Sequence, residues 1–220
     1  MENRELFERF ADLTLEWNEK INVTAIRDRE EFLNKNVYDS LLLCGHPEIE
    51  KASRVLDMGT GGGLPGVPLA IAYPDKDFLL VDSVGKKLKV VEAVCAELGL
   101  KNVKVLHARA EELARKPEYR EQFDLVVSRA VANMSSLSEY CLPFVKIGGN
   151  FVAYKTETSA EEIEQASNAI KKLGGSPVRL VRPDNAEGEL SGHLFAVVEK
   201  SVETSSLFPR AGGQPLKKPL

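Results

Sequence analysis

A chain of 220 residues, 43% hydrophobic and 28% charged, has the composition of a soluble globular protein with one sizeable core. Its 33 acidic and 29 basic side chains give a net charge of −4, which predicts low non-specific affinity for nucleic acid. No apolar stretch reaches about 18 residues, and no basic region followed by an apolar run opens the chain, so we expect neither a membrane span nor a signal peptide.

The cysteines and histidines exclude two further classes of protein. Cys44, Cys95 and Cys141 are odd in number, widely separated and embedded in apolar helical patterns. We therefore expect buried thiols in a reducing compartment, the cytoplasm. Three scattered histidines form no cluster with cysteine or aspartate, so no metal site is expected.

The N-terminal region predicts a small helical cap. Residues 2–20 carry apolar side chains at steps of three and four, namely Leu6, Phe10, Leu13 and Trp17. Asp28 and Glu31 fit a capping box for a second helix, whose apolar positions are Phe32, Leu33, Val37, Leu41 and Leu42. We expect these helices to pack on a main sheet that begins after residue 50.

Segment 54–66 predicts a strand, a tight loop and the start of a helix. Its apolar run ends near Asp57 and is followed by Gly59, Gly61, Gly63 and Gly66. Glycine permits positive φ angles and close approach of the backbone to a ligand, and Pro65 and Pro68 suit the first turn of a helix. Since open α/β sheets bind ligands at the carboxyl ends of their strands, we expect a nucleotide-like cofactor here.

Two classes of cofactor use such a loop, and the glycine spacing leaves both open. Gly61-x-Gly63-x-x-Gly66 fits the dinucleotide-binding fingerprint. Asp57-x-Gly59-x-Gly61-x-Gly63 fits the signature of proteins that bind S-adenosylmethionine. The carboxylate of Asp57 favours the second class, because it would repel a pyrophosphate and attract the α-ammonium group of a methionine moiety.

A regular alternation of apolar runs and helical patterns follows the loop. The runs lie at 77–82, 103–107, 123–128 and 149–155, and the helical patterns at 64–73, 85–98, 134–145 and 159–173. This order predicts a Rossmann-like α/β fold with a parallel sheet between two layers of helices. Two last runs, 177–182 and 193–199, are too close together for a crossover helix, so they predict an antiparallel hairpin at one sheet edge.

Polar residues end the second and third predicted strands. Asp82 stands 21 residues after Gly61, where a carboxylate can accept hydrogen bonds from both ribose hydroxyls of a cofactor. Its alternative role is an N-cap for the helix that begins near residue 85. Ala110 and Glu111 follow the third strand, where a backbone N–H can bind an adenine ring nitrogen. Glu111 alone also fits an acid in the first turn of a helix.

Two cations end the fourth and fifth predicted strands. Arg129 is either a partner in a surface salt bridge or a group that holds a carboxylate or phosphate. Lys155 is either a solvated strand end or a contact to the substrate.

Motifs spread over nearly the whole chain carry a family resemblance. They are Asn22-Val-Thr-Ala-Ile26, Tyr38-Asp-Ser-Leu41, Leu56 to Gly66, Val81-Asp-Ser83, Ser128-Arg-Ala130 and the ending Pro209-Arg-x-Gly-x-x-Pro-x-Lys-Lys-Pro-Leu220. In these motifs the chain resembles the family of ribosomal RNA small subunit methyltransferase G, also called GidB. The first and last motifs make the resemblance specific, because they are not general methyltransferase features.

The resemblance implies the fold of a class I S-adenosylmethionine-dependent methyltransferase, with a seven-stranded, mostly parallel sheet, an antiparallel edge hairpin and an N-terminal helical cap. It implies methylation of N7 of a specific guanine in the decoding region of 16S ribosomal RNA. The acidic charge of the chain adds that the RNA is met within a small-subunit particle rather than as a free strand. It places cofactor contacts at Gly59, Leu64, Ala110, Glu111 and Arg129, and the residue-based arguments add Asp57, Gly61 and Asp82. No catalytic residue is assigned, because N7 carries no proton and needs no general base.

Two positions depart from the family pattern. Asn36 stands where members commonly have histidine, and Thr156 where they commonly have glycine. If the histidine contacts RNA, its role here is weakened or passes to an amide. If it is structural, little changes.

We divide the chain into a cap (1–50), a methyltransferase domain (51–203) and a basic tail (204–220). The tail contains Arg210, Lys217 and Lys218 and no acidic residue, so it is either a disordered end or an extension that contacts RNA. In both cases we expect its deletion to leave affinity for S-adenosylmethionine unchanged.

Other functions stay open at this stage. One is a small-molecule methyltransferase of the same fold, and another is a dinucleotide-binding oxidoreductase. A third is a ribosome assembly factor without catalytic activity. Binding of S-adenosylmethionine rather than nicotinamide dinucleotides would separate the cofactor classes.

Overall fold

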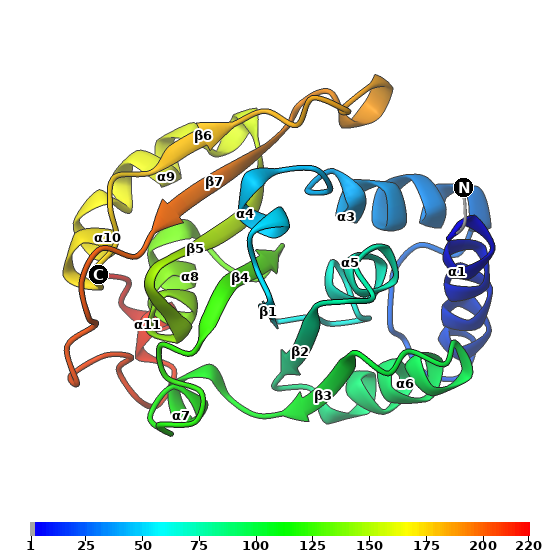
Figure 1. Cartoon of the computed structure of the whole chain (residues 1–220), viewed down its shortest axis with the longest axis horizontal. Coiled ribbons are helices and arrows are strands. Elements are labelled where there is room, and N and C mark those ends of the chain that lie inside the picture. Colours follow the sequence, from blue (N-terminus) through cyan, green and yellow to red (C-terminus); the bar gives the residue numbers. More distant parts are fainter. Residues whose placement is uncertain (1–2) are drawn as a thin grey trace.

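The computed structural model describes residues 3–220, in which a seven-stranded sheet lies between two layers of helices (Figure 1). The strand order is β3-β2-β1-β4-β5-β7-β6. The strands are β1 (Arg54–Met58), β2 (Asp77–Asp82), β3 (Val103–His107), β4 (Phe123–Arg129), β5 (Val145–Thr156), β6 (Arg179–Val181) and β7 (His193–Glu199). β1 to β5 pair in parallel, and β7 is antiparallel to both β5 and β6. The predicted sheet and its edge hairpin are confirmed.

The helices follow the predicted order and include short ones that the sequence did not indicate. They are α1 (Arg4–Asn18), α2 (Arg29–Phe32), α3 (Asp39–Leu41), α4 (Pro47–Glu50), α5 (Gly66–Ala72), α6 (Gly85–Glu97), α7 (Ala110–Leu113), α8 (Met134–Cys141), α9 (Ala160–Gln165), α10 (Ser167–Lys172) and α11 (Gln214–Lys217). A π-helix (Leu33–Tyr38) joins α2 to α3. The unpredicted α4 and α11 have four residues each, too few for an apolar period to be visible. Helix α7 also has four residues, and only the alternative role of Glu111 as a first-turn acid indicated it.

The sheet is buried on both faces, which explains its continuous apolar runs. Successive side chains of a strand point to opposite faces. Accordingly Val55 and Leu125 belong to one hydrophobic core, whereas Leu56 and Val126 belong to the other. The cap, α5 and α6 cover the first face, and α7 to α10 cover the second.

The helical cap forms where it is predicted, although Met1 and Glu2 lie outside the described residues. Phe10 and Leu13 of α1 are buried in the first core. Asp28 caps α2, because its carboxylate accepts a hydrogen bond from the Glu31 N–H at 2.8 Å. The same core contains residues of the cap and of the sheet, so the two regions pack as one unit.

Two predicted boundaries moved for local reasons. Helix α8 ends at Cys141 and continues as a 3-10 turn over Leu142–Phe144, since Pro143 has no N–H to give to a helix. Strand β5 begins at Val145, four residues early, with a register shift against β4. At Gly149 a Cβ atom would lie 2.7 Å from the Asp124 carbonyl oxygen, so the close approach of the strands there requires glycine.

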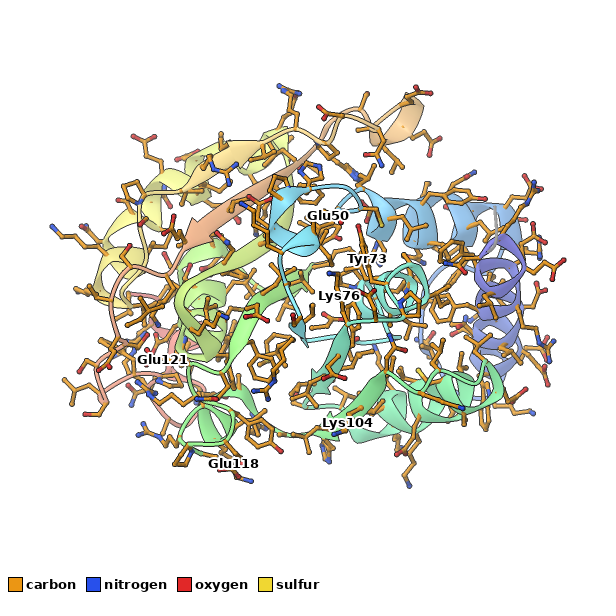
Figure 2. The ribbon with its side chains drawn as sticks, viewed as in Figure 1. Glu50, Tyr73, Lys76, Lys104, Glu118 and Glu121 are labelled. Atoms are coloured by element: carbon orange, nitrogen blue, oxygen red, sulfur yellow. The ribbon has the colours of Figure 1, made fainter. Side chains whose placement is uncertain are left out.

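The tail is packed on the protein rather than disordered. Its first residue, Thr204, donates its N–H to the carboxylate of Glu121 at 2.7 Å; Glu121 is labelled in Figure 2. The Arg120 guanidinium donates to the carbonyl oxygens of Thr204, Ser205 and Phe208 at 2.6, 3.2 and 3.0 Å. The chain then runs to α11, which packs against α8.

Within residues 3–220 three further expectations can be compared with the structure. All three cysteines are free, with Cys95 and Cys141 buried and Cys44 half-buried. No group of three or more metal-binding side chains gathers in this range. None of its helices combines the length and apolar character that a membrane crossing requires.

Candidate functional site

A cavity of about 510 Å³ opens at the carboxyl ends of the strands, where the chain switches from one half of the sheet to the other. β1 and β4 are neighbours there, although two strands separate them in the sequence. Of the eight predicted cofactor residues, seven line this cavity: Gly59, Gly61, Leu64, Asp82, Ala110, Glu111 and Arg129. The eighth, Asp57, does not.

The glycine loop after β1 is fixed by backbone hydrogen bonds. The N–H groups of Gly59 and Thr60 both donate to the Val81 carbonyl oxygen, at 2.8 and 3.0 Å. Gly61 has φ +56°, and a Cβ atom placed on it would meet no protein atom within 4 Å. Gly61 therefore borders open cavity space. Gly59 is different, because its Cβ would lie 2.4 Å from the Val131 side chain.

Asp57 lies beneath the loop and is fully buried. Its Oδ2 accepts hydrogen bonds from the Thr60 hydroxyl at 2.6 Å and from the Gly66 N–H at 2.9 Å. Its Oδ1 has no hydrogen-bond partner. Burial raises the pKa of this carboxyl to about 7, against the opposing effect of the two hydrogen bonds. Asp57 thus holds the loop in place through these two hydrogen bonds. Its contact with a methionine ammonium group stays a prediction.

Asp82, at the end of β2, connects the loop to the next helix. One carboxylate oxygen accepts from the Gly61 N–H at 2.8 Å and the other from the Val84 N–H at 2.8 Å. The alternative that Asp82 is the N-cap of α6 is wrong, because the N-cap residue is Val84 and no side chain caps this helix. Each carboxylate oxygen can accept a second hydrogen bond, so a ribose contact is compatible with these two.

Ala110 and Glu111 begin the short helix α7 after β3. Glu111 is a first-turn acid, as one alternative predicted, yet it is 6% exposed and lines the cavity. Its Oε1 accepts a hydrogen bond from the Gly213 N–H at 3.2 Å. The sequence gives no sign of this partner, which lies 102 residues away.

Arg129, at the end of β4, binds the cap. Its guanidinium donates to Asp39 Oδ2 at 2.6 Å and to Asn36 Oδ1 at 2.7 Å. Asp39 also pairs with His193 at 2.7 Å. The pair with Asp39 is 17% and 8% exposed, so the surface salt bridge considered from the sequence is in fact largely buried. Asn36 lines the cavity, and its Nδ2 is buried without a partner.

Sequence reasoning missed several wall residues. The cap contributes Val23 and Thr24, whose N–H groups both donate to Asn18 Oδ1 at 2.8 and 3.0 Å. These two residues belong to the first motif of the family resemblance, which was the available signal. The tail contributes Gly213 and Leu216, which lie within the last motif of the resemblance. Helix α8 contributes Tyr140, for which the sequence offered no signal.

The four residues predicted to contact RNA divide into two pairs. Lys155 is 11% exposed and its ammonium group donates to Glu162 at 2.5 Å, so it is neither a solvated strand end nor a free cation. Arg210 is bound to the buried carboxylate of Glu139. These contacts argue against both as RNA-binding groups. Lys217 and Lys218 are exposed. Thr156 does not line the cavity, and its hydroxyl bonds to that of Thr158 at 2.8 Å.

The chain is similar to one protein family over most of its length. A family model described as "GidB: rRNA small subunit methyltransferase G" matches residues 3–190. A Ribosomal RNA small subunit methyltransferase G of Lachnoclostridium phytofermentans is 47% identical over 216 residues, 98% of this chain and 89% of the relative. The protein of the same name in Clostridium perfringens (strain 13 / Type A) is 46% identical over 211 residues, 96% of this chain and 88% of the relative.

Solved structures show the same fold at low sequence identity. The S-adenosylmethionine-dependent methyltransferase SibL in its apo form aligns with a TM-score of 0.58 at 18% identity, over 82% of this chain and 61% of SibL. Fibrillarin of Methanococcus jannaschii, a pre-rRNA processing protein, aligns with a TM-score of 0.57 at 16% identity, over 77% of each chain. The predicted class I methyltransferase fold is confirmed.

Proposed function

Because this chain belongs to the family of rRNA small subunit methyltransferase G, and is thus an S-adenosylmethionine-dependent methyltransferase, we propose that it methylates N7 of a guanine in 16S ribosomal RNA. Membership in the family decides between the two cofactor classes that the glycine spacing leaves open. It also removes the oxidoreductase and the non-catalytic assembly factor from the alternatives.

One observation carries the assignment of the site, namely that seven predicted residues from four separate loops border a single cavity. We assign the methionine part of the cofactor to the side of Gly59 and Gly61, the ribose to Asp82 and the adenine to Ala110 and Glu111. Asp82 and Glu111 supply carboxylate acceptors, which suit hydroxyl and amine donors. Arg129 is assigned to the end where methionine and guanine meet.

The reaction requires alignment more than proton transfer. When bound, S-adenosylmethionine would supply a methyl group on a positively charged sulfur. Its transfer to the in-plane lone pair of N7 would break the bond between sulfur and methyl, leave a neutral thioether and a cationic purine, and release no proton. A site that excludes water and holds N7 in line with the methyl group therefore suffices. Oxygen acceptors near the purine would stabilise its developing charge.

The charge of the protein favours a structured substrate. With 29 basic and 33 acidic side chains, the chain has little electrostatic attraction for a free RNA strand. A small-subunit particle presents its RNA in a defined shape, so recognition can depend on fit as well as on phosphate contacts. We accordingly propose a particle in the bacterial cytoplasm as the substrate, with Lys217 and Lys218 as candidate phosphate contacts.

The test is methyl transfer to small-subunit particles from cells that lack the protein. Purified protein and S-adenosylmethionine with an isotope-labelled methyl group are incubated with particles or with naked 16S RNA. Nucleosides are then analysed by mass spectrometry. We expect labelled 7-methylguanosine, with faster transfer to particles.

Asp82→Ala protein is the matched control for adventitious activity, since it removes a proposed cofactor contact. Label in a different nucleoside would refute the proposed target atom. Equal rates on particles and naked RNA would refute the preference for a particle.

A further inference from the structure

The tail is held against the cofactor cavity by an ion pair that the sequence does not reveal. Arg210 donates four hydrogen bonds to the carboxylate of Glu139, through its backbone N–H at 2.7 Å, its Nε at 3.0 and 3.1 Å and its Nη2 at 2.6 Å. The Glu139 side chain is fully buried on α8, and that of Arg210 is 23% exposed. A buried carboxylate requires such a partner, so this contact fixes the position of the tail.

Beyond Arg210 the tail passes directly over the cavity. Gly212 and Gly213 have φ of +68° and +71°, conformations that turn the chain sharply. The N–H of Gly213 then donates to Glu111 Oε1 at 3.2 Å. A second fixed point follows, because the Ser136 hydroxyl on α8 donates to the Pro215 carbonyl oxygen at 2.6 Å. Gly213 thus lies between two anchors on the same helix.

The contact to Glu111 leaves that residue with one occupied and one available oxygen. Oε1 accepts from Gly213, whereas Oε2 accepts no hydrogen bond from the described residues. Glu111 and Gly213 both line the cofactor cavity, and the side chain of Leu216 closes the wall beside them. No other hydrogen bond from the described residues reaches this carboxylate.

We propose that the tail positions Glu111 for recognition of the adenine ring, with the Gly213 N–H holding Oε1 so that Oε2 accepts from the exocyclic amine of the cofactor. The pair Arg210 and Glu139 is the clamp that keeps Gly213 in place. A carboxylate fixed in advance loses less side-chain freedom on binding, so affinity and selectivity for adenine both gain. This inference rests on the proposed function, since it takes the cavity as the cofactor site.

This role of the tail changes the expected effect of its deletion on cofactor affinity. A tail apart from the sheet would leave cofactor affinity unchanged when deleted, whereas a tail that positions Glu111 would not. If the tail has only a structural role, its loss should weaken the binding of all ligands of the cavity equally. Selectivity between adenine and a ring without the amine therefore separates the three roles.

The experiment measures binding of S-adenosylhomocysteine and S-inosylhomocysteine by calorimetry. The second ligand carries a carbonyl oxygen in place of the exocyclic amine, and this oxygen cannot donate to a carboxylate. Wild-type protein is compared with Arg210→Met, which keeps side-chain length but removes the guanidinium. Leu207→Ala is the matched control, because Leu207 lies in the tail, is 74% exposed and takes no part in the contact between Arg210 and Glu139.

We expect Arg210→Met to weaken S-adenosylhomocysteine binding by about tenfold and S-inosylhomocysteine binding much less, so that the ratio of the two affinities falls. Leu207→Ala should leave both affinities unchanged. A double-mutant cycle with Glu111→Gln gives the direct test of positioning. Once Glu111 is Gln, Arg210→Met should no longer change the ratio.

Thermal melting confirms that each variant is folded, and the double variant Arg210→Met/Glu139→Met, which removes the clamp without leaving a buried unpaired carboxylate, replaces Arg210→Met if the latter is not. An unchanged affinity ratio in a folded clamp variant would overturn the inference, and so would an equal loss for both ligands. These outcomes are distinct from failure of the proposed function, in which wild-type protein would bind neither ligand.

Discussion

The two ends of the sheet differ in whether their buried polar groups have hydrogen-bond partners. At the amino end, where β1, β2 and β3 begin, polar side chains are satisfied by hydrogen bonds. At the carboxyl end, two buried polar atoms have no partner. Both ends belong to the same strands, so the difference comes from the segments that pack over each end of the sheet.

The amino end is built for stability. Figure 2 labels Glu50, Tyr73 and Lys76 there, and the Lys76 ammonium group, 7% exposed, donates to the carbonyl oxygens of Glu50 and Ala52 at 3.1 and 2.8 Å. The Asn102 amide donates to the carbonyl oxygens of Ala70, Tyr73 and Lys76, at 3.0, 3.2 and 3.2 Å. These contacts tie the start of β2 to the segment before β1, and the start of β3 to the segment before β2, which leaves little capacity for a ligand.

The carboxyl end contains buried polar atoms that have no hydrogen-bond partner in the protein. Buried side-chain atoms without a partner number three within the described residues, and two of them, Asp57 Oδ1 and Asn36 Nδ2, lie here. The third, Thr14 Oγ1, lies in α1. An unpaired buried polar atom lowers stability, so its presence marks a place where function competes with stability.

The largest effect should come from Gly61→Val, compared with Gly99→Val at the amino end. Both glycines have positive φ, +56° and +68°, and neither position has a protein atom within 4 Å of an added Cβ. Each substitution should therefore lower the free energy of unfolding by a similar amount, about 1–3 kcal/mol. Only Gly61→Val should abolish binding of S-adenosylmethionine in calorimetry, because only its side chain would occupy the cavity.

Retained binding in Gly61→Val protein would contradict the assignment of this loop to the cofactor. Lost binding in Gly99→Val protein would show that the two sheet ends are not independent.

The second effect concerns the pH dependence of stability, which should have opposite sign for Asp57 at the carboxyl end and for Asp124 at the amino end. Burial raises the pKa of Asp57 to about 7, against an ordinary value of 3.8. Between these values the folded protein holds a proton that the unfolded chain has lost. The free energy of unfolding should therefore fall as pH rises from about 4 to about 7, by on the order of 4 kcal/mol. Asp57→Asn should flatten this decline in urea unfolding.

Asp124 at the amino end provides the contrast. Its partial burial alone would raise the pKa, but hydrogen bonds from Lys146 and from the N–H groups of Arg54 and Ser53 outweigh burial and lower it. Its contribution is therefore present above pH 4 and lost in more acidic solution. A flat profile for wild-type protein between pH 4 and 7 would contradict the buried, proton-binding Asp57.

A third comparison uses two aspartates that each accept two hydrogen bonds from backbone N–H groups. Asp82 binds Gly61 and Val84 at the carboxyl end, and Asp124 binds Ser53 and Arg54 at the amino end. Asp82→Ala should weaken cofactor binding by about 1–3 kcal/mol, through the lost charge-assisted hydrogen bonds. Asp124→Ala should lower the melting temperature without changing affinity. Calorimetry with equal affinities for wild-type and Asp82→Ala protein would remove Asp82 from the site.

The smallest effect concerns RNA. Arg210 is engaged in the clamp, so two exposed cations, Lys217 and Lys218, are left in the tail as phosphate contacts. Replacing both with Ala should reduce the salt dependence of particle binding by a slope of about 1.4–1.8. Replacing Lys51 and Lys101, exposed cations at the amino end, should not change it. Equal slopes for the two double variants would leave the tail without a role in RNA binding.

Much of the fold follows from the sequence because its signals are local. The strands at 77–82 and 103–107 have the predicted bounds, since apolar runs and the turn residues that flank them act over a few positions. Gly99 and Gly174 both have positive φ at helix ends, as glycine after a helix predicts. The short helices α4 and α11 were not predicted, because a single turn shows no apolar period.

The site residues, like the fold, were predictable where the signal in the sequence is local. The glycine loop, Asp82, Glu111 and Arg129 were accessible because each directly follows a strand, and parallel strands end at one edge of the sheet. Which partner each residue has was not accessible. Arg129 binds Asp39, 90 residues away, and Glu111 binds Gly213, 102 residues away.

The sequence by itself determined the order of elements, the cofactor loop and the family, whereas tertiary structure alone decided the role of the tail. Arg210 in a basic, proline-containing ending has the appearance of a free cation, and Glu139 has that of an ordinary helix acid. Only packing shows that Glu139 is fully buried and therefore needs Arg210. Burial depends on contacts between distant segments, and local composition does not encode it. The tail is therefore part of the wall of the site and not a disordered end.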